Sequence, residues 1–406
     1  MTREIVDVAI VGAGPAGTTL AAALARRGVE VVVVERSPTW RWRAGGVFTS
    51  PAAVAALVRA GVPAATVDAV TRPIPAMRLE TPGGSMVRLT YGADHGGPPA
   101  VGFDRSALDP ALERLALEAG AIIRRGVTAH DVQLGGPGPA VLRLDDGDLR
   151  ARIVVGADGT HSSVARAAGV ARTPRLPPRV GLTWHVADPR PPTDPPSDAR
   201  LVVGPDAYLG LAPVPGARLN IGVVLGPSWR AALARDGAAA TVRRVLSDVP
   251  TRDDDPVSWA DATICDRIAG ASPLGVRVTS RAGPDWFLVG DAAGFLDPFT
   301  GEGLNRALVS TELAARAIPA ALARDGRDKG PAAGAYDRSM RRGLAAKDAV
   351  SWLVQSFLAR PRLFEYVARR LVERPDVRAT MGLVMGDLIP ASRALDPRFL
   401  AALLAP

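Results

Sequence analysis

The chain has 406 residues, of which 47% are hydrophobic and 22% are charged, and its formal net charge at pH 7 is +8. This composition is typical of a soluble globular protein, and the length allows two closely packed domains. No apolar stretch is long enough to span a bilayer, so we expect no transmembrane segment. Cys265 is the single cysteine, which excludes an internal disulfide. Because no signal-peptide pattern is present, we expect a cytoplasmic location. All but two of the Lys and Arg residues are arginines, scattered rather than gathered in a stripe, so nucleic-acid binding is not predicted.

The first part of the chain predicts a parallel βαβ unit. Residues 5–11 form a short buried strand, a helix follows and stops before Gly28, and residues 29–35 form a second strand. Near-continuous Val and Ile are typical of strands that are covered on both faces. A short helix (51–61), a hairpin (76–90) and an amphipathic helix (105–121) come next, followed by strands at 121–126, 127–134, 140–146 and 150–158.

The middle of the chain has a different pattern. Four segments, 179–187, 199–204, 207–214 and 218–225, look like antiparallel strands of a second sheet. The proline-dense segment 188–198 predicts a loop. Two helical stretches (229–236 and 240–248) and a buried strand (286–291) follow, and from Gly301 the chain is almost entirely helical.

The predicted fold class is therefore α/β, with a discontinuous Rossmann-like nucleotide-binding domain and an inserted α+β substrate domain built on an antiparallel sheet. We assign residues 1–72, 101–171 and 282–325 to the first domain, and residues 73–100 and 172–281 to the second. Residues 326–406 form a helical C-terminal region. Its apolar positions at helical spacing could cover a core, close a substrate pocket or form a face of a homodimer.

A glycine-rich motif joins the first strand to the first helix. In VGAGPAGTTLAAAL, Gly12 permits a tight turn, Gly14 lets the backbone approach a pyrophosphate, and Gly17 lets helix and strand pack closely. The helix N-terminus presents free N–H groups to the phosphates. Glu35 closes the second strand, where a carboxylate accepts hydrogen bonds from ribose hydroxyls. A glycine-rich turn without a ligand is the alternative to this NAD or FAD site, which also includes Pro15, Ala16 and Arg36.

Two later motifs decide between these cofactors. The segment VVGADGTHSSVAR (154–166) places Asp158 and Gly159 after a buried strand, and FLVGDAAGFLDPFTGEGLN (287–305) places Asp291 after another. Together with the glycine-rich motif, and in this order, they resemble the FAD-dependent monooxygenase superfamily of the para-hydroxybenzoate hydroxylase type, with its geranylgeranyl reductase and flavin-dependent halogenase relatives. The resemblance covers most of the chain to about residue 325, and the middle sheet matches in layout only.

The resemblance implies that the cofactor is FAD and indicates which residues hold it. Asp291 would bond a ribityl hydroxyl, Pro298 would lie against the reactive face of the isoalloxazine ring, and Arg105 would lie near the cofactor. Asp158, with Gly159, matches a DG motif tied to FAD and nicotinamide binding. Backbone N–H groups at a helix N-terminus would reach the pyrimidine edge of the ring and favour negative charge there. These groups belong to Gly301, Gly303, Leu304 and Asn305.

The activity that the resemblance favours is monooxygenation. NAD(P)H would reduce FAD as a transient partner, and O₂ would add to give a C4a-(hydro)peroxide. A small or medium apolar or aromatic metabolite would then be hydroxylated or epoxidised, in a biosynthetic pathway. Halogenases need an active-site lysine, and the absence of lysine before Lys329 disfavours halogenation. No metal site is predicted.

A reductase or dehydrogenase of carbon–carbon double bonds in a prenyl-type or polyene substrate is the alternative. The segment TGEG (300–303) matches the reductases, and 207–224 shares several of their positions. Yet Gly210 stands where they have Trp, Ala212 where they have Phe, and Ala44 where many have Cys. A flavin-binding carrier without turnover is a third interpretation.

Three residues are candidates for the substrate side of the site. Trp42 is close to the expected flavin region and could wall a cavity. His185, on a strand of the middle sheet, could face a substrate or could be a packed, hydrogen-bonded histidine. Tyr208 could bond a substrate or fill the core. Cys265 is interpreted as a small buried hydrophobe.

Overall fold

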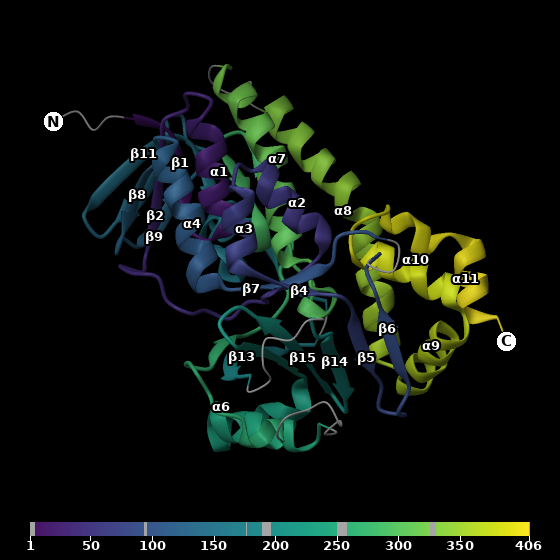
Figure 1. Cartoon of the computed structure of the whole chain (residues 1–406). Coiled ribbons are helices and arrows are strands. Elements are labelled where there is room, and N and C mark those ends of the chain that lie inside the picture. Colours follow the sequence, from purple (N-terminus) through teal and green to yellow (C-terminus); the bar gives the residue numbers. More distant parts are fainter. Residues whose placement is uncertain are drawn as a thin grey trace.

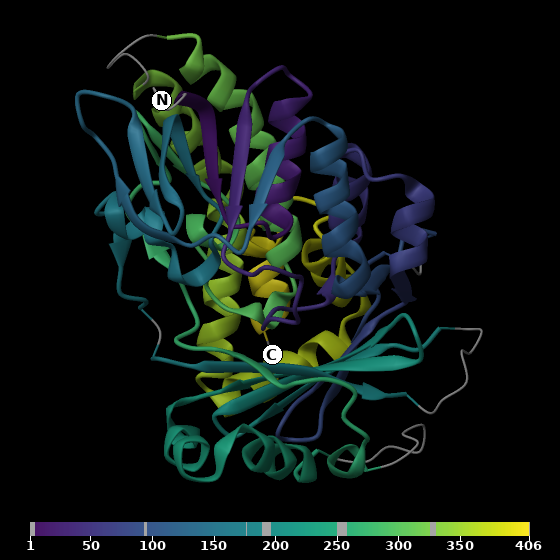
Figure 2. The ribbon, with the colours of Figure 1, turned by 90° about the vertical axis from the view of Figure 1, so that its left-hand side faces the viewer.

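The computed structural model describes residues 5–92, 96–175, 177–188, 196–249, 258–324 and 330–405. The protein is mixed α/β, as predicted, with a mainly parallel sheet covered by helices, an antiparallel sheet below it and a group of C-terminal helices at one side (Figure 1). Figure 2 shows the two sheets from the side, with a helix on the outer face of the antiparallel sheet. Of the proline-dense segment predicted as a loop, residues 189–195 lie outside the described residues.

The larger sheet gathers strands from distant parts of the chain. Its strands are β1 (Ile5–Val11), β2 (Val31–Glu35), β8 (Ile122–Arg125), β9 (Ala129–Gln133), β10 (Ala140–Leu144), β11 (Gly147–Gly156), β19 (Ala282–Gly283) and β20 (Trp286–Leu288). The order is β19-β20-β11-β1-β2-β8, and β10 and β9 continue antiparallel from β11. Val8 of β1 pairs in parallel with Ile153 of β11 and with Val31 of β2. The predicted parallel βαβ unit is therefore confirmed.

Helices pack on this sheet and form the largest core with it. They are α1 (Pro15–Ala25), α2 (Pro51–Arg59), α3 (Ala64–Val70), α4 (Arg105–Glu118), α5 (Ser163–Ala167), α7 (Gly303–Leu322) and α8 (Gly330–Leu358). α1 lies between α4 and α7. Ile10, Leu20 and Phe287 are fully buried at this interface. The sequence did not predict α3, because so short a helix shows too little of the helical repeat.

The second sheet is mostly antiparallel. Its strands are β5 (Met77–Glu80), β6 (Met86–Leu89), β13 (Val180–Ala187), β14 (Ala199–Gly204), β15 (Ala207–Val214), β16 (Arg218–Leu225) and β17 (Ala269–Ala271). Their order is β17-β13-β16-β15-β14-β5-β6, and β14 pairs with β5 in parallel. The predicted hairpin and the four predicted middle strands are confirmed.

The two faces of the second sheet pack against different partners, because side chains alternate along each strand. Trp184 and Ile221 point to the outer face, where they form a core with helix α6 (Arg230–Ser247). Tyr208 and Val224 point to the inner face, in a core shared with the C-terminal region. Gly237 has φ 75° and breaks α6, so the two predicted helical stretches form one kinked element.

The C-terminal region is helical, as predicted. The helices α9 (Pro361–Glu373), α10 (Pro375–Met385) and α11 (Pro397–Leu404) lie beside one end of the long α8 (Figure 1). Phe364 of α9 and Met381 of α10 share a core with Leu79 and Val87 of the β5–β6 hairpin. The same core reaches Tyr208, so these helices adjoin the inner face of the second sheet.

Smaller strands connect the main layers. β3 (Phe48–Thr49), β7 (Ala100–Phe103) and β4 (Thr71–Ile74) form a sheet that contacts β15. β12 (Ala171–Arg172) pairs with β18 (Arg277–Val278). Among the helices of the described ranges, none combines the length and the apolarity that a bilayer crossing requires.

Candidate functional site

The glycine-rich motif forms the turn between β1 and α1. Gly12 has φ 104°, and a Cβ on Gly17 would lie 1.9 Å from the carbonyl oxygen of Gly12, so neither position accepts a side chain. A Cβ on Gly14 would instead meet no atom within 4 Å. Gly14 is the N-cap of α1, ahead of Pro15 and the buried Ala16, and no described side chain caps this end. The helix N-terminus can therefore receive an anion in the open space beside Gly14.

Glu35 is a buried carboxylate at the end of β2. Its Oε2 accepts a hydrogen bond from the Ala13 amide (3.1 Å), and its Oε1 accepts one from the Ser37 amide (2.9 Å) and one from Arg43. Burial acts to raise the pKa of Glu35, but the two amides and the Arg43 charge outweigh it and hold the pKa below its ordinary value. The ionised carboxylate thus holds the glycine-rich turn. Arg36, the next residue, is exposed.

The DG segment follows β11, beside β1. The Ala157 amide donates to the Val11 carbonyl (2.9 Å), which places the segment next to the glycine-rich turn. Asp158 Oδ2 accepts hydrogen bonds from the amide and the hydroxyl of Ser163 (2.6 and 2.8 Å). Its Oδ1 is buried and has no partner within the described residues. A Cβ on Gly159 would meet no atom within 4 Å, so the backbone there is open to a ligand.

Asp291 lies just after β20, in the short helix η5 (Gly290–Ala293). The residue is partly exposed, and its carboxylate has no hydrogen-bond donor in the described part of the chain. Burial raises the pKa of Asp291, and the charges of Arg306 and Arg105 oppose this in part. A partly desolvated carboxylate without a protein donor destabilises the ligand-free protein. Hydroxyl groups of a bound ligand would supply the missing donors.

The loop through η6 (Pro298–Thr300) leads into α7. Gly301 has φ 65°, and a Cβ there would lie 2.5 Å from the ring of Phe48, so the loop lies directly against β3. The first-turn N–H groups of a helix have no acceptor inside the helix, and no described side chain caps α7. In α7 these groups belong to Gly303, Leu304 and Asn305.

Arg105 stands in the first turn of α4 and pairs with Asp109 at 2.8 Å. Trp40 also donates to Asp109 (3.1 Å). A Cβ on Gly45 would lie 2.7 Å from Arg105 Nη1, whereas one on Gly46 would meet no atom within 4 Å. Arg105 therefore packs directly against Gly45. Its positive charge also opposes the rise in the pKa of Asp291.

The sequence has no lysine before Lys329, but the structure brings Lys347 into this region. α8 folds back and places Lys347 Nζ 3.7 Å from Glu302 Oε2, beside the N-terminus of α7, so the late position of lysine in the sequence does not keep it from this region. Lys347 is buried and donates to Asp387 (2.6 Å). Asp387 also accepts a hydrogen bond from the Asn305 side chain (2.9 Å). The ammonium group of Lys347 is therefore held in a buried hydrogen-bond network, and this disfavours a role for it in halogenation.

Tyr208 anchors the loop before α7. Its hydroxyl donates to Asp297, which also accepts hydrogen bonds from Arg179 (3.1 Å) and from the Phe299 amide (3.0 Å). The Tyr208 and Phe299 rings meet edge-on with centroids 5.0 Å apart. Burial, with the Asp297 carboxylate, raises the pKa of Tyr208. The hydrogen bond to Asp297 supports the interpretation of Tyr208 as a packed core residue. Asp297 was not among the residues predicted from the sequence.

His185 and Trp42 lie against each other, with ring centroids 4.6 Å apart. Trp42 Nε1 donates to the Thr183 carbonyl (3.1 Å). His185 Nδ1 lies 2.6 Å from Asp266 Oδ2, and its amide donates to Asp266 Oδ1 (2.8 Å). The His185 Nε2 atom is buried and unpaired within the described residues. The neighbouring Cys265 is exposed, so its interpretation as a buried hydrophobe is wrong.

The inner face of the second sheet carries a pair of glycines. Gly210 pairs directly with Gly222 across β15 and β16, and Gly222 pairs with Thr183 of β13. A Cβ on Gly222 would meet no atom within 4 Å, and one on Gly210 would first meet Leu201 at 3.9 Å. We call this pair the glycine floor. It is a patch of bare backbone on the face that carries Tyr208, which stands two residues before Gly210.

Several groups in this region lack partners that a nucleotide flavin would supply. The N-terminus of α1 suits phosphates, the Asp291 carboxylate suits hydroxyls, and the first turn of α7 suits a carbonyl oxygen. Within the described ranges, no group of His, Cys, Asp and Glu side chains is placed to hold a metal ion. The hydrogen-bonding groups present therefore fit an extended cofactor with phosphates at one end and a polar ring at the other.

Comparison with known families decides the cofactor. The FAD binding domain family matches residues 5–332. The chain belongs to this family. It is an FAD-dependent oxidoreductase, as the resemblance implied, and its relatives carry enzyme names of that kind.

These relatives are named for reduction and for hydroxylation. The chain is 31% identical over 322 residues to menaquinone reductase of Mycolicibacterium smegmatis, covering 76% of this chain and 75% of the relative. It is 28% identical to digeranylgeranylglycerophospholipid reductase of Methanoculleus marisnigri, over 76% and 75%. It is 29% identical to ubiquinone hydroxylase UbiL of Rhodospirillum rubrum, over 95% and 90%.

Solved structures share the fold of this FAD-binding chain. A geranylgeranyl bacteriochlorophyll reductase-like protein of Thermoplasma acidophilum has a TM-score of 0.76 and 21% identity, covering 97% of this chain and 99% of that one. The flavin-dependent halogenase CmlS has a TM-score of 0.71 and 23% identity, covering 85% and 63%. At identities of 21% and 23%, these similarities establish the fold alone.

A buried arginine of α7 was missed by sequence reasoning. Arg306 pairs with Asp348 of α8 (2.6 Å) and with Glu302 (3.6 Å). Burial acts to lower the pKa of Arg306, but these acids outweigh it and raise the pKa, so the guanidinium stays charged. Arg306 directly follows Asn305 in the motif. Its surroundings depend on where α8 lies, which the local sequence does not reveal.

Proposed function

We propose that this protein is an FAD-dependent monooxygenase that uses NAD(P)H and O₂ to oxygenate a flat, apolar ring, such as an aromatic metabolite or a quinone-type lipid. The observation that carries the proposal is the glycine floor. Gly210 and Gly222 leave bare backbone on the sheet face that adjoins the 297–300 loop, and a flat ring can stack on such a surface.

We assign the residues of the three motifs to FAD. The N-terminus of α1 beside Gly14 would bind the pyrophosphate, Glu35 the adenosine ribose and Asp291 the ribityl chain. Pro298 would lie against the isoalloxazine ring. When bound, FAD supplies the redox chemistry, namely hydride acceptance and O₂ activation. The rest of the assignment is Gly12, Pro15, Ala16, Gly17, Arg36, Arg105, Asp158, Gly159, Gly301, Gly303, Leu304 and Asn305.

In this proposal the chain's own residues bind, orient and exclude water. The positive end of α7 favours negative charge at the polar edge of the flavin ring. Tyr208 and Asp297 fix the loop that carries Pro298, so the ring and the glycine floor keep a defined spacing. The helices α9 and α10 adjoin the same face and limit the access of water.

Two observations favour oxygenation over reduction. Gly210 and Ala44 stand where the reductases carry Trp and many carry Cys, so those two side chains are not available for the reaction. The likeness to ubiquinone hydroxylase UbiL covers 95% of this chain and must include most of the C-terminal helices, whereas the likeness to the two reductases covers 76%.

Reduction of a carbon–carbon double bond in a prenyl-type substrate is the second candidate function. The identity to menaquinone reductase, 31%, exceeds the 29% to the hydroxylase. The TGEG segment at residues 300–303, with its buried Glu302, also follows the reductase pattern.

A prenylated quinone with a short unsaturated side chain separates these candidates, since it carries both a ring and an alkene. The FAD-loaded protein is incubated with this quinone and with NADH or NADPH, in the presence and in the absence of O₂. The masses of the products are then measured by mass spectrometry. Oxygenation gives a product heavier by one oxygen atom, labelled from isotopic O₂ in step with NAD(P)H oxidation. Reduction of the alkene gives a product heavier by two hydrogen atoms, with or without O₂, and this mass gain remains after any quinol formed from the ring has been reoxidised to the quinone. Flavin retention without either product, across a panel of rings, supports the carrier interpretation.

Three further inferences from the sequence stay predictions. The domain boundaries are tested by limited proteolysis, the cytoplasmic location by cell fractionation, and the homodimer by light scattering.

A further inference from the structure

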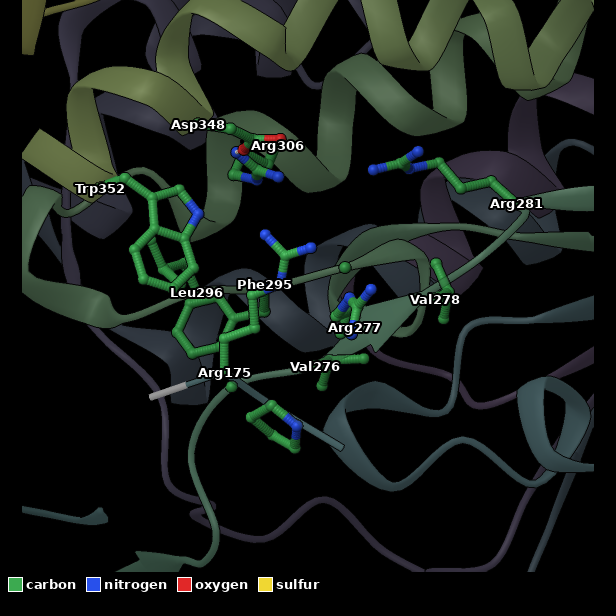
Figure 3. A pocket seen from close by; sticks show the side chains of 13 residues that line it. Arg175, Val276, Arg277, Val278, Arg281, Phe295, Leu296, Arg306, Asp348 and Trp352 are labelled. Carbon is green, nitrogen blue, oxygen red and sulfur yellow. Dashed lines mark hydrogen bonds and ion pairs between the residues drawn. The ribbon is translucent and has the colours of Figure 1, made fainter. Parts of the chain in front are cut away.

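A cavity of about 220 Å³ lies beside residues 294–296, in the segment that follows Asp291 (Figure 3). We propose that it binds the phosphate group of a ligand that also has a flat or apolar body. Its walls come from the segment 294–296, from the β12–β18 region and from the facing sides of α7 and α8. None of the residues assigned above to FAD lines it, so it is a separate site.

Positive charge dominates this cavity. Arg175, Arg277, Arg281 and Arg306 line it, and Asp348 is the one acidic residue among its lining residues. In Figure 3, Arg281 extends from one side toward Arg306 and Asp348, and Arg277 lies below them. Guanidinium groups match the oxygen geometry of phosphate and bind it with charge-assisted hydrogen bonds.

The arginines are not equally neutralised by protein acids. Arg306 is paired with Asp348 at 2.6 Å, and Arg281 lies 3.8 Å from Asp337. Within the described residues, Arg175 and Arg277 have no carboxylate partner. Both side chains are exposed, so water solvates them in the ligand-free protein, and two unpaired positive charges on one concave wall would attract the negative charge of a ligand.

The opposite wall of the cavity is apolar. Phe295 and Leu296 come from the loop, Trp352 from α8, and Pro174 from the segment after β12. Figure 3 shows the rings of Trp352 and Phe295 on the side away from Arg281. A free inorganic ion would leave this wall uncovered, whereas a phosphate ester of a flat or apolar group would contact both walls.

The cavity and the flavin loop share a wall. Gly294 lines the cavity three residues after Asp291, and Arg306 contributes to the electrostatic field at the Asp291 carboxylate. Two ligands have the required chemistry: a pyridine or adenine nucleotide, and a phosphorylated lipid. Both carry a phosphate and an apolar or aromatic body, so the experiment has to separate them.

The test is calorimetric titration of the FAD-loaded protein with inorganic pyrophosphate, adenosine 2′,5′-bisphosphate and a prenyl monophosphate. The variant Arg175→Ala/Arg277→Ala is compared with Arg230→Ala/Arg243→Ala, which removes the same charge from two exposed arginines of α6. We expect the first variant to bind the preferred probe about tenfold more weakly or worse, and the second to bind it normally. Unchanged melting temperature and flavin content show that both variants are folded.

The outcome assigns the source of the phosphate. Tightest binding of the bisphosphate indicates a nucleotide, and tightest binding of the prenyl monophosphate indicates a lipid. Equal weakening in both double variants, or saturation by none of the probes, would overturn the proposal, as would pyrophosphate binding as tightly as both esters. The readout needs no turnover, so the result does not depend on whether the protein oxygenates or reduces its substrate.

Discussion

The Glu35 carboxylate accepts a hydrogen bond from the Ala13 amide, 3.1 Å away, and so ties the end of β2 to the glycine-rich turn. A residue predicted to bind the ribose of the cofactor therefore has a second task in the protein without ligand. It holds the turn in a fixed conformation, with the helix N-terminus open in front of it.

Glu35→Gln should lower the free energy of unfolding of the FAD-free protein by about 1–3 kcal/mol at neutral pH. The pKa of Glu35 is held below its ordinary value of 4.5, so the ionised carboxylate stabilises the folded state above that pH. This stabilisation is lost as the pH falls through the folded-state pKa. Denaturant unfolding at about pH 7 and about pH 3 measures the difference, which should shrink in acid. Glu30→Gln, at an exposed position, is the control, and a difference that persists in acid contradicts the expectation.

Asp291→Asn should change FAD affinity and stability in opposite directions. Losing a charged acceptor should weaken FAD binding by about 1.5–3 kcal/mol, or roughly 10- to 100-fold. Burial raises the pKa of Asp291, which means that its ionised form costs the FAD-free protein stability, so the neutral amide should raise the melting temperature of that form. Flavin fluorescence titration and thermal unfolding give the two quantities. Unchanged FAD affinity would remove Asp291 from the proposed site.

Two glycines of the same turn should respond differently to alanine. Gly17→Ala puts a Cβ 1.9 Å from a backbone oxygen of Gly12, and this overpacking should destabilise the FAD-free protein by about 1–3 kcal/mol. At Gly14 a Cβ meets nothing within 4 Å and φ is −79°, so Gly14→Ala should change that stability by less than about 0.5 kcal/mol. Gly14→Ala should nevertheless weaken FAD binding, since the Cβ occupies the space proposed for the pyrophosphate. Equal effects of the two variants on stability would show that the turn is not packed as described.

Gly210→Trp should abolish turnover of a ring substrate while FAD stays bound. The indole would fill the space above the glycine floor, where the nearest atom to a Cβ is 3.9 Å away on Leu201. Gly210→Ala is the matched control and should keep most of the activity, because a methyl group fits at that distance. Steady-state kinetics with the accepted substrate, together with flavin content, check both variants. Full activity of Gly210→Trp would place the substrate elsewhere.

The strands and the loop motifs could be predicted from the sequence because their signals are local. Val and Ile runs marked β1 and β2, and the spacing of Gly12, Gly14 and Gly17 marked the turn between strand and helix. The position of Lys347 could not be predicted, for the opposite reason. Lys347 reaches Glu302 because α8 folds back along α7, and nothing near Lys347 in the sequence records that contact.

By itself, the sequence determined the βαβ unit, the alternating strands of the second sheet and the positions of the three loop motifs. Each depends on residues within a few positions of one another, through side-chain periodicity and glycine conformation. Only the tertiary structure decided which side chains meet: Tyr208 with Asp297, His185 with Asp266 and Trp42, and the arginines around the cavity beside residues 294–296. These contacts join residues far apart in the chain, and the packing of sheets and helices brings them together.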